Sequence, residues 1–349
     1  YLRISYSGRV TDIALGRWPE ISLMQARQEA RRRRKTLGLE PPRGYVLNDA
    51  FKLWCGLKKG RIVSYADERR RLERYLIKPL GRRQIDEISA PLVITTVKHI
   101  EAEGHQATLK RVLMRTHEIL DLAVCAGYIH HNPCERLSRV FAAPVVTPMP
   151  APEWHELPNI MQVMKSAPVR MRILFLFSTC SMLRPGENAK LKRSWIDGDI
   201  LTIPAKEMKM GRMHRVPLTV FMKQLLEAEL RLSPHPRGDV IFAAKQAGKH
   251  ISTQTLAKYL HSTQLSGKLV AHGLRSMARS WMADQEISFE VAEACLSHVA
   301  GSSVSRAYQR SDFLTARVLV MTRWSTFIKR CAREADMLDG ILEPERDKI

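Results

Sequence analysis

A proline-rich stretch divides this chain more sharply than any other feature of its sequence. Residues 142–152 read A-A-P-V-V-T-P-M-P-A-P, with four prolines in eleven positions. Proline fixes φ and has no amide hydrogen to donate, so a run of this kind cannot form the interior of a helix or of a sheet. It stays extended and semi-rigid. We therefore expect a linker at 142–152, with separately folded regions before and after it.

Two regions are expected before the linker. Residues 1–43 should form a small α/β unit, because polar and apolar residues alternate over the first fifteen positions and predict a hairpin. A capping box of Ser22 and Gln25 then predicts the start of a helix, and Gly38 predicts its end. The chain begins at Tyr1, inside the first expected strand, so we expect this unit to be truncated.

The second region, residues 45–141, is expected to be a helical bundle. Its clearest helix covers 108–126, where apolar residues recur every three or four positions. Thr108 is the expected N-cap of this helix and Gly127 its expected end. Such a bundle can bury one apolar face of each helix and leave basic residues outside.

After the linker, residues 153–334 should form a mixed α+β domain. A strongly apolar helix covers 169–180, and Pro185 suits the first turn of another. Short strands at 196–204 and 215–218 enclose the loop M-K-M-G-R-M-H.

The last expected helix covers 313–331, and residues 335–349 are expected to be a polar, mobile tail. The predicted fold class is therefore multidomain and mainly α, with small β elements.

The charge of the chain indicates a polyanionic partner. Lysine and arginine number 56 against 35 acidic residues, which gives a net charge of +21 and a pI near 10.0. Nucleic acid is the first candidate, and an acidic membrane surface is the alternative. No apolar run approaches the roughly 18–20 residues that span a bilayer. We expect DNA phosphates to be bound by a set of exposed basic residues: Arg31, Arg32, Arg33, Arg34, Lys35, Arg69, Arg70, Lys110 and Arg111.

The six cysteines show no C-x-x-C spacing and fall mostly in apolar helical stretches. We expect them to be reduced residues of a cytosolic protein.

One stretch, residues 271–308, concentrates residues able to act on a phosphate. His272 and Arg275 are three apart, which places them one turn apart on a helix. His298 follows a second apolar helix, and Tyr308 follows a polar loop. Each of these features alone is more often structural than catalytic. Two further candidates, Arg184 and Lys209, precede them in the chain, and the combined order favours a catalytic interpretation.

Six candidate residues occur along the chain in the order Arg184, Lys209, His272, Arg275, His298 and Tyr308. In this order they resemble the tyrosine recombinase (integrase) family. Its catalytic set is an arginine, a lysine in a β-hairpin, H-x-x-R, a second histidine or tryptophan, and a tyrosine nucleophile. The segments G-R-W-P-E-I-S-L-M-Q-A-R, K-M-G-R-M-H-R-V-P-L and A-Y-Q-R-S-D-F-L are similar to integrases of prophages and genomic islands related to satellite phages.

The resemblance implies an arm-type DNA-binding domain at 1–43, a helical core-binding domain at 45–141 and a catalytic domain at 153–334. It implies integration and excision of mobile DNA through a 3′-phosphotyrosine, with no metal, no cofactor and no ATP. The implied partners are double-stranded attachment-site DNA, three further copies in a homotetramer, and DNA-bending and excisionase proteins. The implied location is the bacterial cytoplasm, at the nucleoid.

It also assigns roles. Arg184 and Arg275 would clamp the non-bridging phosphate oxygens, because guanidinium is planar and always charged. Tyr308 would attack phosphorus; a free phenol has a pKa of about 10, so it needs a base, for which His272 is the candidate.

Lys209 would protonate the leaving 5′-oxygen, with Lys206 as its main rival. His298 would donate a hydrogen bond to the phosphate, and Glu187 would orient the site. His214, expected in the hairpin loop, would either touch DNA or serve as a turn residue.

Two departures from the family pattern stand beside these residues. Ser181-Met182 replaces a common threonine-glycine pair, and Ser297 replaces a glycine before the second histidine. Neither removes a catalytic group, so we expect activity. Two alternatives stay open at this point: a type IB topoisomerase that relaxes DNA, and a DNA-binding protein that has lost catalysis.

Overall fold

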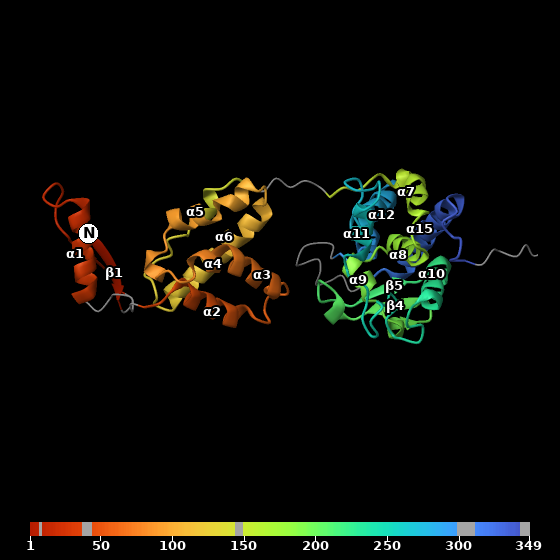
Figure 1. The fold of residues 1–349 in the computed structure, drawn as a ribbon, viewed down its shortest axis with the longest axis horizontal. Helices are drawn as coiled ribbons and strands as arrows, with labels where there is room; N and C mark the ends of the chain where they lie inside the picture. The colour runs from red at the N-terminus through yellow and green to blue at the C-terminus, as the bar shows by residue number, and fades with distance from the viewer. Residues whose placement is uncertain (7–8, 37–43, 144–148, 299–310, 343–349) are drawn as a thin grey trace, which may run out of the picture. The chain divides into compact units, whose positions relative to one another are not determined.

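The computed structural model describes residues 1–6, 9–36, 44–143, 149–298 and 311–342. It divides into two compact units, Tyr1–Thr147 (unit 1) and Pro148–Ile349 (unit 2), and the division falls inside the stretch 142–152 (Figure 1). Each unit has its own cluster of buried apolar side chains.

Unit 1 begins with the predicted hairpin. Strands β1 (Leu2–Tyr6) and β2 (Arg9–Ile13) are antiparallel, and helix α1 (Leu23–Thr36) follows. The capping box is present: Ser22 N donates to Gln25 Oε1 at 2.8 Å, and Gln25 N donates to Ser22 Oγ at 3.2 Å. Gly38, the expected helix end, lies outside the described residues.

The rest of unit 1 is helical, as predicted. Its elements are α2 (Leu47–Lys58), α3 (Tyr65–Leu72), a π turn at Glu73–Ile77, α4 (Lys78–Leu80), α5 (Ala90–Ala102) and α6 (Gln106–Cys125). Helix α6 buries the expected apolar face, but the prediction that Thr108 caps it is wrong. The helix begins directly after Gly104 ends α5, so His105 is the N-cap and Thr108 lies in the first turn.

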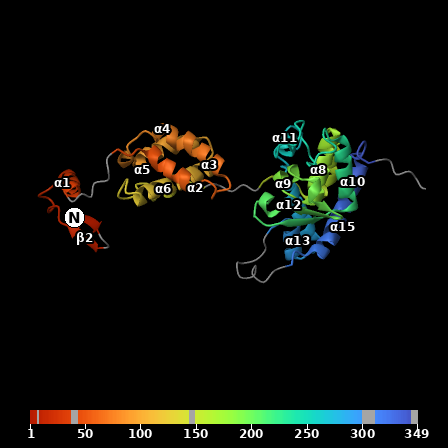
Figure 2. The same cartoon turned by 90° about the horizontal axis from the view of Figure 1, so that it is seen from below.

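Unit 2 is built around one helix, α8 (Val169–Ser181), whose side chains are buried over most of its length. The other helices are α7 (Leu157–Met164), α9 (Pro185–Ala189), α10 (Val220–Leu232), α11 (Thr255–His261), α12 (Gly273–Asp284), α13 (Phe289–Cys295) and α15 (Leu314–Glu334). Figures 1 and 2 show α10, α12 and α15 packed around α8. The indole of Trp324 on α15 donates to Thr179 O on α8 at 2.9 Å.

A three-stranded antiparallel sheet lies at one side of unit 2. Its strands are β3 (Ile196–Asp197), β4 (Ile200–Ile203) and β5 (His214–Pro217), in that order. The first predicted strand, 196–204, is thus two strands. Gly198 turns the chain between them with a φ of 54°, a conformation that glycine adopts without steric cost.

The prediction of a mobile tail is wrong for residues 335–342. Met337 and Ile341 are fully buried against the core of unit 2. Arg172 on α8 donates to the carbonyls of Met337 at 2.7 Å and Asp339 at 2.9 Å. The polar composition of the tail concealed two apolar side chains spaced four residues apart, which is one helical turn. Residues 343–349 lie outside the described part.

Candidate active site

Arg184 lies in the short connection between α8 and α9. It is the N-cap residue of α9, and Pro185 occupies the first helical position, as predicted. Glu187 accepts from the backbone N of Arg184 through Oε2 and from Nη1 through Oε1, both at 2.9 Å. One buried carboxylate therefore fixes both the backbone and the side chain of Arg184, and a charged pair of this kind is a strong hydrogen bond.

Arg275 lies in the first turn of α12 and is only 3% exposed. Its Nη1 donates to Met182 O, and its Nη2 donates to Leu296 O at 2.6 Å. These carbonyls belong to the C-terminal ends of α8 and α13. Nε of Arg275 is buried, and within the described part of the chain it has no hydrogen-bond partner.

Two helix C-termini thus surround one buried guanidinium. The carbonyl end of a helix carries a partial negative charge, which favours a cation beside it. Burial, and then the nearby charge of Arg184, lowers the pKa of Arg275 to about 10, while Glu187 and Glu293 act in the opposite direction. A pKa of about 10 leaves Arg275 charged at neutral pH.

Both helix ends depend on a left-handed residue that is not glycine. Met182 has a φ of 56° and Ser297 a φ of 54°. At the end of α13, the N–H groups of Ser297 and His298 donate to the carbonyls of Ala294 and Glu293. This is the Schellman pattern, in which glycine is the usual residue at the position of Ser297. The two departures noted in the sequence are therefore the two residues that turn the chain beside Arg275.

His298 is held between Arg275 and Glu293. Its Nδ1 lies 2.8 Å from Glu293 Oε2, and its Nε2 lies 3.0 Å from Arg275 Nη2. Because an arginine N–H can only donate, Nε2 is the acceptor here and the ring proton is assigned to Nδ1. Glu293 also accepts from Arg279 Nε at 3.0 Å.

Glu293 was missed by sequence reasoning. It lies five residues before His298, a spacing that does not share a helical face. The Schellman turn folds His298 back over the last turn of α13, which brings the two side chains together. A histidine directly after a left-handed residue at a helix end was the available signal.

His272 is the N-cap residue of α12 and is half-buried. Burial is the largest cause that lowers its pKa, followed by the charges of Arg275, Arg184, His298 and Lys209. Since lowering favours the uncharged form, the imidazole is neutral at pH 7 and free to accept a proton.

Lys209 lies in the turn between a short 3₁₀ segment, Ala205–Glu207, and strand β5, and it is exposed. Its charge acts on His272, whereas Lys206 is not among the charges that do. Both lysines are exposed, so the choice of Lys209 over Lys206 stays a prediction. Tyr308 lies outside the described residues.

The prediction that His214 sits in the hairpin loop is wrong. It is a buried residue of β5, and burial, followed by the charge of Arg317, lowers its pKa to about 3. Arg317 on α15 donates to Arg215 O at 2.6 Å, and the Arg215 side chain pairs with Asp312 at 2.7 Å. This group, also missed, ties β5 to the beginning of α15.

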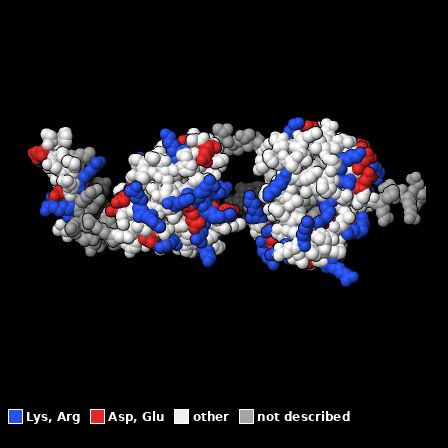
Figure 3. Space-filling model, viewed as in Figure 1, with Lys and Arg blue, Asp and Glu red and all other residues white. Residues whose placement is uncertain are grey.

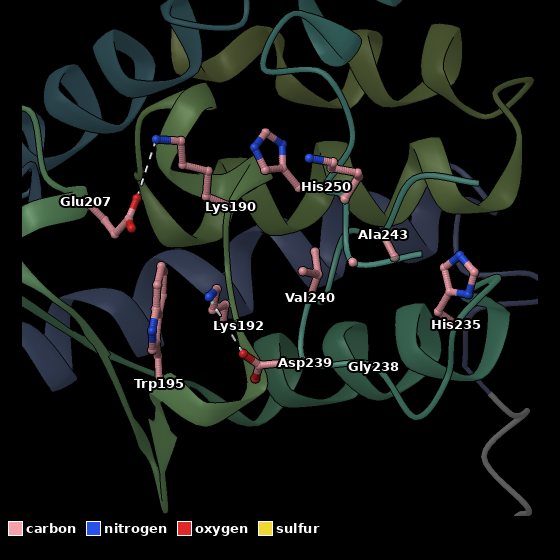
Figure 4. A pocket seen from close by; sticks show the side chains of 12 residues that line it. Lys190, Lys192, Trp195, Glu207, His235, Gly238, Asp239, Val240, Ala243 and His250 are labelled. Carbon is pink, nitrogen blue, oxygen red and sulfur yellow. Dashed lines mark hydrogen bonds and ion pairs between the residues drawn. The ribbon is translucent and has the colours of Figure 1, made fainter. Parts of the chain in front are cut away.

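A separate hollow of about 490 Å³ lies beside α9 (Figure 4). Lys190 and Lys192 line it and pair loosely with Glu207 at 3.5 Å and Asp239 at 3.9 Å. Its two imidazoles, His235 and His250, bond to backbone carbonyls. Within the described residues, no group of three metal-ligating side chains forms a metal site.

The basic residues nominated as DNA contacts lie mostly on exposed helix faces and mostly next to carboxylates. Arg69 pairs with Glu73 at 2.7 Å, and Arg70 pairs with Asp67. Figure 3 shows Lys and Arg gathered over the α3 part of unit 1, with acidic residues among them.

Arg32 and Arg33 share Glu29, and Lys110 is exposed on α6. The side chains of Arg31, Arg34 and Lys35 are not described.

Sequence reasoning missed the organising carboxylate of this face, Glu68. It is 2% exposed and lies between Arg71 at 2.9 Å, Arg111 at 3.4 Å and Arg115 at 3.5 Å. Arg115 also pairs with a second carboxylate, Glu118, at 2.6 Å. All six cysteines are free thiols, and none of the helices among the described residues combines the length and apolar character needed to cross a bilayer.

Comparison with known proteins identifies the family. The model of the phage integrase family matches residues 153–314, and that of the phage integrase central domain matches residues 49–140. The prophage integrase IntA of Escherichia coli K12 is 33% identical over 283 residues, covering 79% of this chain and 68% of that protein. The integrase of Enterobacteria phage P4 is 24% identical over 357 residues, covering 90% and 80%.

Solved structures show the same fold. Lambda integrase, as a tetramer bound to a Holliday junction, aligns with a TM-score of 0.62 at 18% identity, over 88% of this chain and 90% of that one. A lambda integrase fragment bound as a dimer to a core site aligns with a TM-score of 0.59 at 18% identity, over 77% and 96%. The mainly helical fold with a small sheet is thereby confirmed. With two arginines, two histidines and a lysine grouped at the ends of its helices and hairpin, the chain belongs to the phage integrase family, as a tyrosine recombinase whose activity is site-specific DNA integration.

Proposed function

We propose that this integrase cuts and rejoins attachment-site DNA at a single phosphate-binding site, through a 3′-phosphotyrosine on Tyr308. The observation that carries the proposal is the grouping of Arg184 and Arg275. Arg275 bonds to the carbonyl of Met182, two residues before Arg184, and the charge of Arg184 lowers the pKa of Arg275. Two like charges near each other in a partly buried site repel, and an anion bound between them would relieve that repulsion.

The described contacts leave donors for that anion. Glu187 and Ser297 occupy Nη1 of Arg184, and among the described residues Nε and Nη2 have no hydrogen-bond partner. Two guanidinium groups would bind the non-bridging oxygens of the scissile phosphate. They would stabilise the charge that grows in the five-coordinate transition state.

His272 is the proposed base and Lys209 the proposed acid. The phenolic proton of Tyr308 passes to His272, the phenolate oxygen forms a bond to phosphorus, and the bond from phosphorus to the 5′-oxygen breaks. Lys209 gives a proton to that leaving oxygen. The reverse steps, with the 5′-hydroxyl of another strand, rejoin the DNA. Because the phosphotyrosine ester conserves the phosphodiester, we propose that neither ATP nor a metal ion is needed.

His298 would donate a hydrogen bond to the phosphate only after a change from its present state. Its Nε2 now accepts from Arg275, so the imidazole has to carry protons on both nitrogens, with Nδ1–H kept on Glu293. A doubly protonated His298 would direct Nε2–H at the N–H of Arg275, which is also a donor. A bound phosphate would supply oxygen atoms that accept from both residues.

DNA and further copies of this chain are the proposed partners. The charge of +21 suits a polyanion, and the lambda integrase structures hold DNA as a dimer and as a tetramer on a Holliday junction. We propose a homotetramer on attachment-site DNA, with DNA-bending and excisionase proteins as accessory factors, in the bacterial cytoplasm at the nucleoid.

The test uses a nicked duplex that carries the attachment site mapped from the junction between the element and its host genome. Wild-type protein should form a denaturant-stable adduct with this duplex. Tyr308→Phe should abolish the adduct and keep DNA binding; an adduct from this variant would reject Tyr308 as the nucleophile. Relaxation of any plasmid without preference for a site would favour the topoisomerase alternative, and binding without any adduct would favour the catalytically silent one.

A further inference from the structure

Ser297 adopts a backbone conformation that costs less for glycine. Its φ of 54° is left-handed, and it occupies the Schellman position at the end of α13. A side chain retained at such a position calls for a compensating contact. At Met182, the other left-handed residue of the site, the side chain is packed in the core of unit 2. At Ser297 the contact is polar.

The hydroxyl of Ser297 reaches across the site to Arg184. Nη1 of Arg184 donates to Ser297 Oγ at 3.3 Å, and the same nitrogen donates to Glu187 Oε1 at 2.9 Å. A guanidinium Nη carries two hydrogens, so the two acceptors use both. Glu187 comes from the same turn as Arg184, whereas Ser297 comes from a helix end far along the chain.

The three residues Leu296, Ser297 and His298 contact both arginines of the site. The carbonyl of Leu296 and Nε2 of His298 accept from Arg275, and the hydroxyl of Ser297 accepts from Arg184. One short segment thereby fixes the spacing between two guanidinium groups. Glycine at 297 would keep the backbone turn and lose the only side chain of this segment that reaches Arg184.

We propose that Ser297 is a positioning residue, which holds Arg184 by Nη1 so that Nε and Nη2 face the scissile phosphate. This inference rests on the proposed function. Its consequence is specific: the hydroxyl contributes to the rate of strand cleavage and not to DNA affinity, because it contacts the arginine and no DNA group is required for that contact.

The experiment compares Ser297→Gly and Ser297→Ala in the full chain, with the nicked attachment-site duplex. We expect the first-order rate of adduct formation at saturating DNA to fall about tenfold in both, as for loss of one hydrogen bond to a charged group. The Kd for DNA should change less than about twofold. Because only alanine keeps the left-handed strain, Ser297→Ala should unfold at a lower temperature than Ser297→Gly while cleaving at the same rate.

The decisive measurement is whether the effect of Ser297→Gly on the cleavage rate depends on Arg184. In an Arg184→Lys background, where the Nη1 donor is absent, Ser297→Gly should slow adduct formation by less than about twofold. Glu286→Gly is the matched control, since Glu286 also has a φ of 54° at a helix end but is exposed and makes no described contact with Arg184; its cleavage rate should equal that of wild type.

Three outcomes would overturn the inference: a wild-type rate in Ser297→Gly, rates that follow the stability of the variants, or an undiminished effect in the Arg184→Lys background. Failure of the wild-type protein itself to form an adduct would instead contradict the proposed function.

Discussion

At Met182, backbone strain destabilises the folded state and burial of the side chain stabilises it, and the net effect on stability can be measured. Its left-handed φ of 56° costs a residue with a side chain about 1–2 kcal/mol, which glycine would not pay. Its side chain is 1% exposed in the core of unit 2. Removing a buried methionine side chain costs about 2–5 kcal/mol through lost burial and a residual cavity. Glycine also loses about 0.5–1 kcal/mol more backbone entropy on folding than alanine.

Met182→Gly should therefore destabilise unit 2 by roughly 2–3 kcal/mol. Glu286 provides the control with the strain but without the burial, because its φ is 54° and its side chain is exposed. Glu286→Gly should stabilise unit 2 by about 0.5–1 kcal/mol.

Scanning calorimetry of the full chain measures both changes, and amide hydrogen exchange of α8 peptides assigns the transition to unit 2. For about 200 residues, the expected shifts are a decrease of roughly 4–10 °C for Met182→Gly and an increase of about 1–4 °C for Glu286→Gly. A rise in the unfolding temperature of Met182→Gly would refute the reasoning, since it would mean that backbone strain outweighs burial at this position.

Three further predictions follow from the site and its supports. Glu293→Gln should slow adduct formation by about tenfold with little change in DNA affinity, because it weakens the hold on His298 Nδ1; an unchanged single-turnover rate would contradict this. The acidic limb of the cleavage pH profile should lie below the usual histidine pKa of about 6.5, because the pKa of His272 is lowered and its neutral form persists to lower pH; a midpoint above 6.5 that vanishes in His272→Gln would show the opposite sign. Truncation after Glu334 should destabilise unit 2 by roughly 4 kcal/mol or more, since two fully buried apolar side chains are lost; unchanged thermal unfolding would show that 335–342 is dispensable.

The sequence predicted elements whose signals are local. Helix α6 followed from the recurrence of apolar residues, the first hairpin from alternation, and the start of α9 from Pro185. Each depends on residues within one or two turns, where spacing along the chain determines spacing in space. The prediction of Thr108 as N-cap was wrong because the chain turns at Gly104 after α5, and α6 begins directly afterwards with His105 as its N-cap.

The contacts within the site could not be predicted in this way. Arg275 is held by carbonyls from α8 and α13, at Met182 and Leu296, which are far from it along the chain. Backbone carbonyls carry no sequence signature, and the conformation that presents them is left-handed at residues where glycine would have been the signal. The buried state of His214 is similar, since its partner Arg317 comes from a helix about a hundred residues later.

The strain of two close guanidinium groups leads to a last prediction, which needs no DNA. Nε of Arg275 is buried and has no partner among the described residues, and burial, followed by the charge of Arg184, lowers the pKa of Arg275. Any small oxyanion that binds between them should stabilise the folded state, by about 1.4 kcal/mol when present at ten times its Kd. Replacing chloride with phosphate at constant ionic strength should therefore raise the unfolding temperature of wild-type unit 2. Arg184→Gln should lose most of this increment, because it removes one of the two cations while Glu187 still has a hydrogen-bond donor. If phosphate and chloride give equal unfolding temperatures, or if Arg184→Gln responds as wild type does, the two arginines do not form one anion site.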